Sequence, residues 1–568
     1  MSRDIKKLKK MLDKKGFDAV QCSQWRDSVR LEGRMDDWGQ IVRAGRLAAK
    51  AGFKGVINDI ELKGFTAPPI RQSSLNDAAL ENDRPDVLII GGGVVGCAIA
   101  RELSKYKLDI LLLEKESDVA MHASSRNDGM IHPGIASKAG SLSGVLNVRG
   151  NHLYTELCQQ LGVPFERYGN LILFSSHLFG KVAKPILSYR QKNLGIEGGK
   201  ISLKRLREIE PNITDEAVGA FEYPSSGVLS PYKLTVALAD NAIENGARFS
   251  MGTIVKSMRT KAGAITEVVT NRGTLRPRMV INAAGVFSDL IAEMANDRFF
   301  SIHPRKGECA ILDKKKGPLL TRSMGLIGFS MLTSDTKGGG VMRTIDDNVL
   351  VGPDAYEQPL REDFSTHAEN MDIILEKHLP LIKGFERADV ITYFAGIRAS
   401  TYEEEFIIEK SEYVNNLIHA AGIQSPGLAA APAIAESIEE ITLKAFFTAY
   451  GQKIKKKNNF NPKRRLAPDM AKLSLEEKQK VIKANPDYGI VVCRCEGISK
   501  GEIIAAVNSP LPARDVDAIK RRVRPGMGRC QGGFCTPLVM QIISQESGKK
   551  LEEINKNGQG SEILKGKL

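Results

Sequence analysis

The sequence predicts a multidomain α/β protein, and three observations lead to this expectation. The chain has 568 residues, which at about 150 residues per domain implies three to four domains. A buried strand, a glycine turn, a helix and a second strand follow one another from residue 86, and two close cysteine pairs lie between residues 493 and 535. Hydrophobic residues make up 42% and charged residues 26%, values of an ordinary globular protein that argue against a fibrous or largely disordered chain.

A small βαβ module is predicted over residues 1–65. After a lysine-rich amphipathic helix pattern, strand-like alternation at 29–31 and 56–60 brackets a helical pattern at 41–48. The V-x-L-x-G opening and the G-V-x-N-x-I close of this stretch resemble a BON-type domain, which implies contacts with a membrane surface or a protein. A structural addition without its own ligand stays open as the alternative. Residues 66–85, rich in Pro, Ser and Asn, predict a linker.

The strand–turn–helix–strand pattern at 86–114 contains a dinucleotide-binding fingerprint. Gly91, Gly93 and Gly96 fit G-x-G-x-x-G, and Glu114 follows the second strand. The first glycine permits a tight turn, the second lets a pyrophosphate approach the backbone, and the third packs helix on strand. Glu114 is placed to accept hydrogen bonds from the adenosine ribose. A glycine turn used only for packing is the alternative, and the fingerprint alone does not separate FAD from NAD.

The loop after the second strand carries a family resemblance. Ser125, Asn127, Gly129, His132 and Gly134 match an S-x-N-x-G-x-x-H-x-G stretch. With further blocks in the same order, among them Ile281-NAAGVFSD, Phe394-AGIRAS and His419-AAGIQSPGLAAAPAIAE, the sequence resembles D-amino-acid-oxidase-like flavoproteins. Within that superfamily it is similar to the FAD-dependent glycerol-3-phosphate dehydrogenases and L-2-hydroxyglutarate dehydrogenases.

This resemblance implies a Rossmann-like FAD-binding domain over residues 86–445. An antiparallel-sheet substrate domain is inserted at about 165–225 and 300–392. The residues expected to hold FAD are those of the glycine turn and of four further blocks: Gly91, Gly93, Gly96, Glu114, Ser125, Asn127, Gly129, Val255, Ala284, Gly285, Gly422, Gly427 and Leu428.

Three residues are candidates for catalysis. His132 is the predicted base, because removal of a hydroxyl proton during hydride departure suits an imidazole near neutral pH. By the resemblance, Arg398 holds the anionic group of the substrate, since a guanidinium matches carboxylate or phosphate bidentately. Arg343 is a third candidate, because it stands where relatives commonly have Pro-Thr. Asp354 is another departure from the family pattern, and these two departures leave the identity of the substrate undecided.

The two cysteine pairs predict a metal centre. A basic linker is expected at 446–485, a small helical domain at 486–550 and a polar tail at 551–568. Within this domain C-x-C is followed by C-x4-C, which resembles the bacterioferritin-associated ferredoxin type of 2Fe-2S domain and the cluster segment of anaerobic glycerol-3-phosphate dehydrogenases. Zinc and free thiols are the alternatives, but C-x-C departs from the usual zinc spacing. The predicted ligands are Cys493, Cys495, Cys530 and Cys535.

Charge and hydropathy bear on partners. The net charge is +14, and the basic stretches lack interleaved aromatics, so no nucleic acid is expected. No window reaches the roughly 18 apolar residues of a spanning helix, and the beginning of the sequence lacks a signal-peptide core, so we expect a cytoplasmic protein that can also sit peripherally at the inner face of the membrane. The expected partners are a small anionic substrate and an electron-acceptor protein or quinone-linked membrane subunit. Both homo- and hetero-oligomers stay open.

The predicted activity is FAD-dependent dehydrogenation of a small anionic hydroxy substrate, with onward electron transfer through a 2Fe-2S cluster. The leading substrate is sn-glycerol 3-phosphate, which would give dihydroxyacetone phosphate. L-2-hydroxyglutarate or another 2-hydroxy acid, and an amine or amino acid, are alternative substrates. A redox or electron-transfer module without turnover is the alternative from another class.

Overall fold

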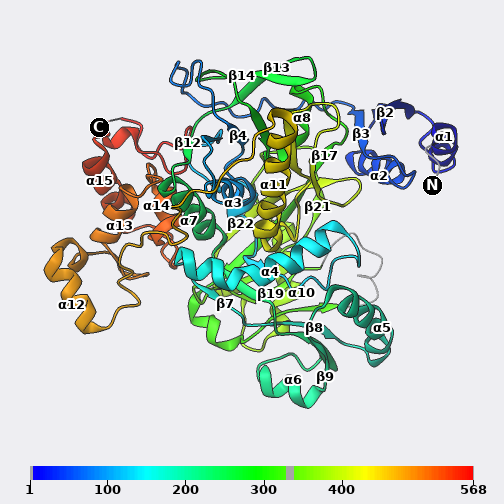
Figure 1. Cartoon of the computed structure of the whole chain (residues 1–568). Helices are drawn as coiled ribbons and strands as arrows, with labels where there is room; N and C mark the ends of the chain where they lie inside the picture. The colour runs from blue at the N-terminus through cyan, green and yellow to red at the C-terminus, as the bar shows by residue number, and fades with distance from the viewer. Residues whose placement is uncertain (1–3, 328–337, 567–568) are drawn as a thin grey trace.

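The structure is a computed structural model that describes residues 4–327 and 338–566. Residues 1–3, 328–337 and 567–568, which belong to the predicted N-terminal module, the second substrate-domain segment and the polar tail, lie outside the described part. Figure 1 follows the chain from the N-terminal module in blue to the C-terminal helices in red, which lie on opposite sides of the central body. No described helix is long and apolar enough to cross a bilayer.

The central body is built on a six-stranded sheet. Its order is β12 (Arg248–Ser250), β5 (Ile110–Leu113), β4 (Val87–Ile90), β16 (Met279–Asn282), β24 (Leu417–Ala421) and β23 (Ile407–Lys410). The first five strands are parallel, and β23 pairs antiparallel with β24. Strands β4 and β5 are unbroken apolar runs because both faces of the sheet are covered.

Helices cover one face of this sheet and a small antiparallel sheet covers the other. Val87 and Ile89 pack toward α3 (Val94–Leu103), α4 (Leu142–Leu161), α7 (Pro231–Glu244) and α11 (Gly427–Tyr450). Leu88 and Ile90 pack toward β13 (Val255–Lys261), β14 (Ala264–Thr270) and β15 (Gly273–Leu275), beside α8 (Ser288–Met294). This three-layer arrangement confirms the predicted Rossmann-like fold class.

A second, nine-stranded sheet is formed by the two inserted segments. Its order is β21 (Tyr356–Glu357), β17 (Ile302–Leu312), β20 (Val349–Gly352), β19 (Gly340–Arg343), β18 (Ser323–Ile327), β8 (Asn170–Phe174), β10 (Gly219–Tyr223) and β9 (Gly199–Ile201), while β22 (Val390–Thr401) also pairs with β17. Helices α5 (His177–Leu194), α6 (Leu203–Ile209) and α10 (Ala368–His378) pack on it.

The sequence predicted an antiparallel sheet for this domain, but one pair of its strands is parallel. Strands β8 and β18 pair in parallel. They come from different insertions, so no hairpin constrains their relative direction, and the two segments join edge to edge at this point. The remaining pairs of the sheet are antiparallel.

The N-terminal module contains the predicted βαβ unit. Strands β2 (Ser28–Met35) and β3 (Val56–Leu62) are parallel and are joined by α2 (Trp38–Ala49). The structure adds β1 (Gln21–Trp25), antiparallel to β2, and α1 (Ile5–Asp13). Tyr402, from the end of β22, completes the apolar core of this module, so the module is fixed to the central body. Its likeness to a BON-type domain stays a prediction.

The C-terminal part is a small helical domain. It consists of α12 (Leu475–Ala484), the short hairpin β25 (Val491–Cys493) and β26 (Ile498–Ser499), α13 (Lys500–Val507), α14 (Val516–Val523) and α15 (Thr536–Ser547). It has its own apolar core, and α14 packs on α7 of the central body. The exact boundaries assigned to all these domains from the sequence stay a prediction.

Candidate functional site

The glycine turn between β4 and α3 leaves no room for side chains. Gly91 has φ +115°, and a Cβ on it would lie 2.4 Å from the carbonyl oxygen of Ala283. A Cβ on Gly96 would lie 1.9 Å from the carbonyl oxygen of Gly91, so only glycine lets α3 pack this closely on the turn. Gly93 is the N-cap of α3 and makes no side-chain cap, so the helix begins with bare backbone N–H groups, which suit a phosphate.

Glu114 lies directly beside this turn, at the end of β5. The backbone N–H of Gly92 donates a hydrogen bond of 2.7 Å to Glu114 Oε2. Burial raises the pKa of this carboxyl. The position is the one from which an acidic side chain reaches an adenosine ribose in dinucleotide-binding folds.

A single cavity of about 1040 Å³ extends from this turn to the nine-stranded sheet. Such a volume is at the upper end of the range for ligand sites, which suits a dinucleotide together with a small substrate. Eleven of the sequence-predicted site residues line it: Gly91, Gly93, Glu114, Asn127, His132, Val255, Ala284, Gly285, Arg398, Gly427 and Leu428.

Four of the predicted cofactor residues lie just behind the cavity wall: Gly96, Ser125, Gly129 and Gly422. Two of these glycines have backbone reasons for their identity. A Cβ on Gly129, at φ +71°, would lie 2.3 Å from the carbonyl oxygen of Leu229, and Gly422 has φ +64°. Ser125 Oγ donates to the carbonyl of His122 and stabilises the loop locally. These four residues therefore support the backbone next to the cavity but do not line it.

The loop that carries His132 is held by α4. The side-chain amides of Asn147 and Asn151 donate to the backbone carbonyl of His132 at 3.2 and 3.0 Å. Both asparagines are buried, and they lie one helical turn apart on the same face. Sequence reasoning missed both residues, although two polar residues four apart on the same face of a helix are a usable signal. They fix the backbone of the half-buried His132 at the cavity wall.

Arg398 contributes a half-buried cation to the cavity. Its Nη1 is buried without a hydrogen-bond partner among the described residues, and its Nη2 donates only a long bond of 3.4 Å to the carbonyl of Asp354. Burial lowers the pKa of its guanidinium. On the neighbouring strand, a Cβ at Gly307 would lie 2.7 Å from Arg398 Nη2, so glycine there leaves room for the guanidinium. A half-buried cation with an unused donor fits an anionic ligand group.

Arg343 is not among the described residues that line the cavity. Its guanidinium pairs with Asp347, four residues ahead in the turn after β19, and lies over the ring of Tyr168. Asp347 therefore neutralises Arg343, which the sequence had suggested as a substrate-binding cation. The structure therefore does not bring Arg343 together with His132 and Arg398.

Arg305 on β17 lines the cavity and was missed by the sequence analysis. It lies directly opposite Arg398 in the register of β17 and β22. Unlike Arg398 it is neutralised, by Glu357 at 2.8 Å and by Glu404. Arg46 of the N-terminal module binds the same Glu357 at 2.6 Å, so this module contributes to the charge network behind the cavity.

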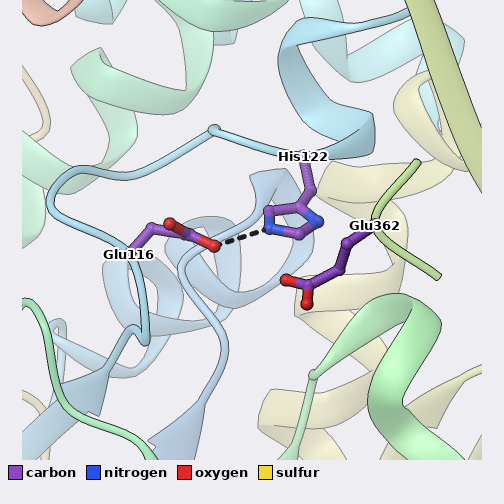
Figure 2. A group of neighbouring side chains, drawn as sticks. All are labelled: Glu116, His122 and Glu362. Carbon is purple, nitrogen blue, oxygen red and sulfur yellow. Dashed lines mark hydrogen bonds and ion pairs between the residues drawn. The ribbon is translucent and has the colours of Figure 1, made fainter. Parts of the chain in front are cut away.

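A cluster of polar side chains lies beside the glycine-turn end of the cavity, which its member His122 lines. Figure 2 shows Glu116, His122 and Glu362 facing one another, with His122 Nε2 at 2.9 Å from Glu116 Oε1. Their ligand atoms lie within 4.8 Å of one another, as in a metal site. However, Lys115 Nζ lies 2.5 Å from both carboxylates and Arg71 binds Glu116 at 2.6 Å, so cations of the chain already neutralise the cluster.

The same cluster lowers the pKa of its central carboxyl, Glu116. Burial alone would raise the pKa of Glu116, but the hydrogen bond from His122 and the charge of Lys115 hold it below its usual range. The linker residue Ile70 reaches the cavity next to this cluster. The segment that the sequence predicted as a plain linker therefore also covers the nucleotide end.

The four predicted cluster ligands come together from two segments, the β25–β26 hairpin and the loop between α14 and α15. Cys495 Sγ lies 3.5 Å from Cys530 Sγ, and Cys535 donates a hydrogen bond to Cys493. This bond and one from the Gly526 backbone lower the pKa of Cys493 to about 6, although burial opposes the shift. Each close contact joins one cysteine of the C-x-C pair to one of the C-x4-C pair.

Thiolate sulfurs in two adjacent pairs fit a binuclear iron–sulfur cluster, in which four cysteines are shared between two irons. No three of the described sulfurs lie within 4.8 Å of one another, as the compact arrangement of a single tetrahedral zinc would require. Gly528 permits the approach, because a Cβ there would lie 2.4 Å from Cys495 Cβ. The donor set thus fits the predicted 2Fe-2S cluster better than zinc.

Family comparisons agree with this geometry. The family model of FAD dependent oxidoreductases matches residues 86–441, and that of the BFD-like [2Fe-2S] binding domain matches residues 491–545. A glycerol 3-phosphate dehydrogenase of Caloramator mitchellensis is 40% identical over 487 residues, which cover 85% of this chain and 98% of the relative. The anaerobic glycerol-3-phosphate dehydrogenase subunit A1 of Haloferax volcanii is 23% identical over 82% of this chain and 84% of its own length.

Among solved structures, the dithionite-reduced L-alpha-glycerophosphate oxidase from Mycoplasma pneumoniae with FAD bound is 26% identical. It superposes with a TM-score of 0.63 over 68% of this chain and 100% of the oxidase. These matches confirm the predicted enzyme class, FAD and the 2Fe-2S cluster as cofactors. The chain belongs to the family of FAD-dependent oxidoreductases and carries a BFD-like 2Fe-2S domain after its flavin-binding part.

Proposed function

We propose that the enzyme oxidises sn-glycerol 3-phosphate to dihydroxyacetone phosphate. The observation that carries the proposal is the half-buried guanidinium of Arg398, which lines the same cavity as His132. Its buried Nη1 has no hydrogen-bond partner among the described residues. An anionic group on the substrate would satisfy this donor and offset the cost of burying the cation. The similarity to glycerol 3-phosphate dehydrogenases supports phosphate as that group.

Two side chains of the chain perform the work on the substrate. Arg398 binds the phosphate and orients the substrate, which fixes the distance between its reacting carbon and the flavin end of the cavity. His132 accepts the hydroxyl proton at a ring nitrogen, and Asn147 and Asn151 keep its backbone in place. FAD, when bound, supplies a hydride acceptor, and the cysteine-bound cluster supplies a one-electron exit.

Anaerobic titration of the purified holoenzyme tests this proposal. We expect sn-glycerol 3-phosphate to bleach the flavin absorbance, and L-2-hydroxyglutarate or amino acids to bleach it far more slowly. His132→Asn should slow bleaching by about 100-fold or more, the usual contribution of a general base. Arg398→Met should raise the substrate concentration at half-maximal bleaching by about tenfold or more, since a charge-assisted hydrogen bond is lost.

Arg343→Met is the matched arginine variant. Because Arg343 pairs with Asp347 outside the cavity, we expect less than a twofold change in bleaching. Faster bleaching by L-2-hydroxyglutarate than by sn-glycerol 3-phosphate would replace the proposed substrate. Normal bleaching in His132→Asn would remove His132 from the base role.

A further inference from the structure

The loops that hold the cysteines present an unusual face to solvent. Phe534, between Cys530 and Cys535, is 85% exposed, although a phenylalanine of a folded domain ordinarily packs. Cys495 itself is exposed, whereas Cys493 and Cys535 are buried. One edge of the predicted cluster site therefore opens outward beside an exposed aromatic ring.

Basic side chains surround this edge. Arg494 lies between Cys493 and Cys495 and is exposed, and Arg529 precedes Cys530 with 65% of its side chain exposed. From the central body, Lys314 Nζ reaches the backbone carbonyl of Cys495 at 3.0 Å. We call Lys314, Arg494, Cys495, Arg529 and Phe534 the cluster face.

Two carboxylates near the cluster face offset part of its charge, but the exposed Arg494 forms no ion pair with a carboxylate of the described residues. Glu496 is almost buried and binds Arg524 at 3.0 Å as well as Lys314 at 3.4 Å. Asp313 is mostly buried and contacts Arg529 at 3.5 Å. The outward part of the face is consequently cationic with an apolar centre, a composition typical of the core and rim of a protein–protein interface.

We propose that the cluster face is the docking site of a separate one-electron carrier protein with an acidic surface. This inference rests on the proposed dehydrogenase function. Phe534 packs at the centre of the interface, and Arg494 and Arg529 attract the acidic rim of the carrier. The exposed predicted ligand Cys495 then lies at the contact, so little protein separates the cluster from the carrier.

The electron balance is simple. Oxidation of one substrate hydroxyl group to a carbonyl releases two electrons and two protons. The two electrons leave in two successive encounters, each of which reduces one carrier molecule by one electron and oxidises the enzyme by one electron. No other oxidant is required, and carriers that accept only one electron are suited to this exit.

The test compares two haem proteins of opposite charge as probes. Cytochrome b5 is acidic and cytochrome c is basic. The holoenzyme is reduced stoichiometrically with dithionite, so that electrons are available whatever the natural substrate is, and is mixed with each oxidised probe. At low salt we expect cytochrome b5 to be reduced at least tenfold faster, and this preference to disappear at high ionic strength.

Variants locate the site. Arg494→Glu and Arg529→Glu should each slow cytochrome b5 reduction several-fold at low salt and accelerate cytochrome c reduction. Phe534→Ala should weaken binding of oxidised cytochrome b5, measured by titration calorimetry, by about tenfold. Phe447→Ala on α11 and Arg205→Glu on α6, which are 62% and 57% exposed away from the cluster face, are the matched controls.

Visible and electron paramagnetic resonance spectra of each variant must show an intact cluster, which separates docking from assembly. A preference for cytochrome c, or equal effects of the control and cluster-face variants, would overturn the proposal. Failure of sn-glycerol 3-phosphate to bleach the flavin would instead refute the proposed substrate, because the dithionite experiment does not depend on it.

Discussion

Asp118 is the buried anchor between the 2Fe-2S domain and the flavin-binding part. It lies in the loop after β5, and its carboxylate accepts hydrogen bonds from Arg521 at 2.9 Å and from Arg522 at 2.8 and 3.0 Å. Both arginines belong to α14 of the 2Fe-2S domain. Asp118 is only 2% exposed, so little solvent screens this ion pair.

The contribution of Asp118 to the free energy of unfolding can be calculated from the pKa of its carboxyl. Burial alone would raise the pKa of Asp118, but Arg522 and Arg521 lower it from 3.8 to about 2. This difference corresponds to about 2 kcal/mol in favour of the charged form. Asp118→Asn imitates the protonated carboxyl and should therefore destabilise the protein by about 2 kcal/mol. Asp118→Ala should cost about 3–5 kcal/mol, because two buried guanidinium groups lose their partner.

Denaturant unfolding of the holoenzyme at pH 7, followed by the loss of the cluster absorbance, measures these losses. Because the folded pKa is depressed, the stabilisation is complete above about pH 4 and is lost as the pH falls toward 2. The difference between wild type and Asp118→Asn should thus shrink to about 1 kcal/mol at pH 3. Asp469→Asn, in an exposed pair with Lys472, should cost less than about 0.5 kcal/mol. A loss below about 0.5 kcal/mol in Asp118→Asn would refute this reasoning.

Two further variants test the cofactor turn and the N-terminal interface. Gly96→Ala should abolish stable FAD binding, measured by fluorescence titration, because its Cβ would lie 1.9 Å from the Gly91 oxygen; Gly199→Ala, with no atom within 4 Å, should bind FAD normally. Burial raises the pKa of Glu403 to about 7, and its Oε1 is buried without a described partner. Stability therefore falls as the pH rises from about 4.5 to 7. Glu403→Gln should be more stable than wild type by about 3 kcal/mol at pH 8 but equally stable at pH 4, which denaturant unfolding would show.

Local patterns predicted those parts of the protein whose geometry is set within one segment. The turn at Gly91, Gly93 and Gly96 could be predicted because the close approach of α3 to β4 is decided by neighbouring residues. Alternating and unbroken apolar runs predicted β2, β4 and the helices between strands for the same reason. The two cysteine motifs likewise carry their ligand spacing in the sequence.

Contacts between distant segments could not be predicted in this way. Arg343 and Arg398 look alike in the sequence. Only the fold shows that Asp347 neutralises Arg343, whereas Nη1 of Arg398 has no hydrogen-bond partner within residues 4–327 and 338–566. Tyr402 gave no sign that it fills the core of a module more than 300 residues earlier. The parallel pairing of β8 with β18 depends on two insertions meeting in space, which no single segment encodes.

The turn between β19 and β20 lies against the 2Fe-2S domain. Arg343 binds Asp347 in this turn, and the adjacent Asp346 accepts a hydrogen bond of 2.7 Å from Arg524 of the 2Fe-2S domain. Arg524 also binds Glu496, next to Cys495, at 3.0 Å. Arg343, which the sequence assigned to the substrate, thus lies in the same turn as a contact with the 2Fe-2S domain. Since Asp118 holds the same domain through α14, the 2Fe-2S domain contacts the flavin-binding part both at the loop after β5 and at the turn between β19 and β20.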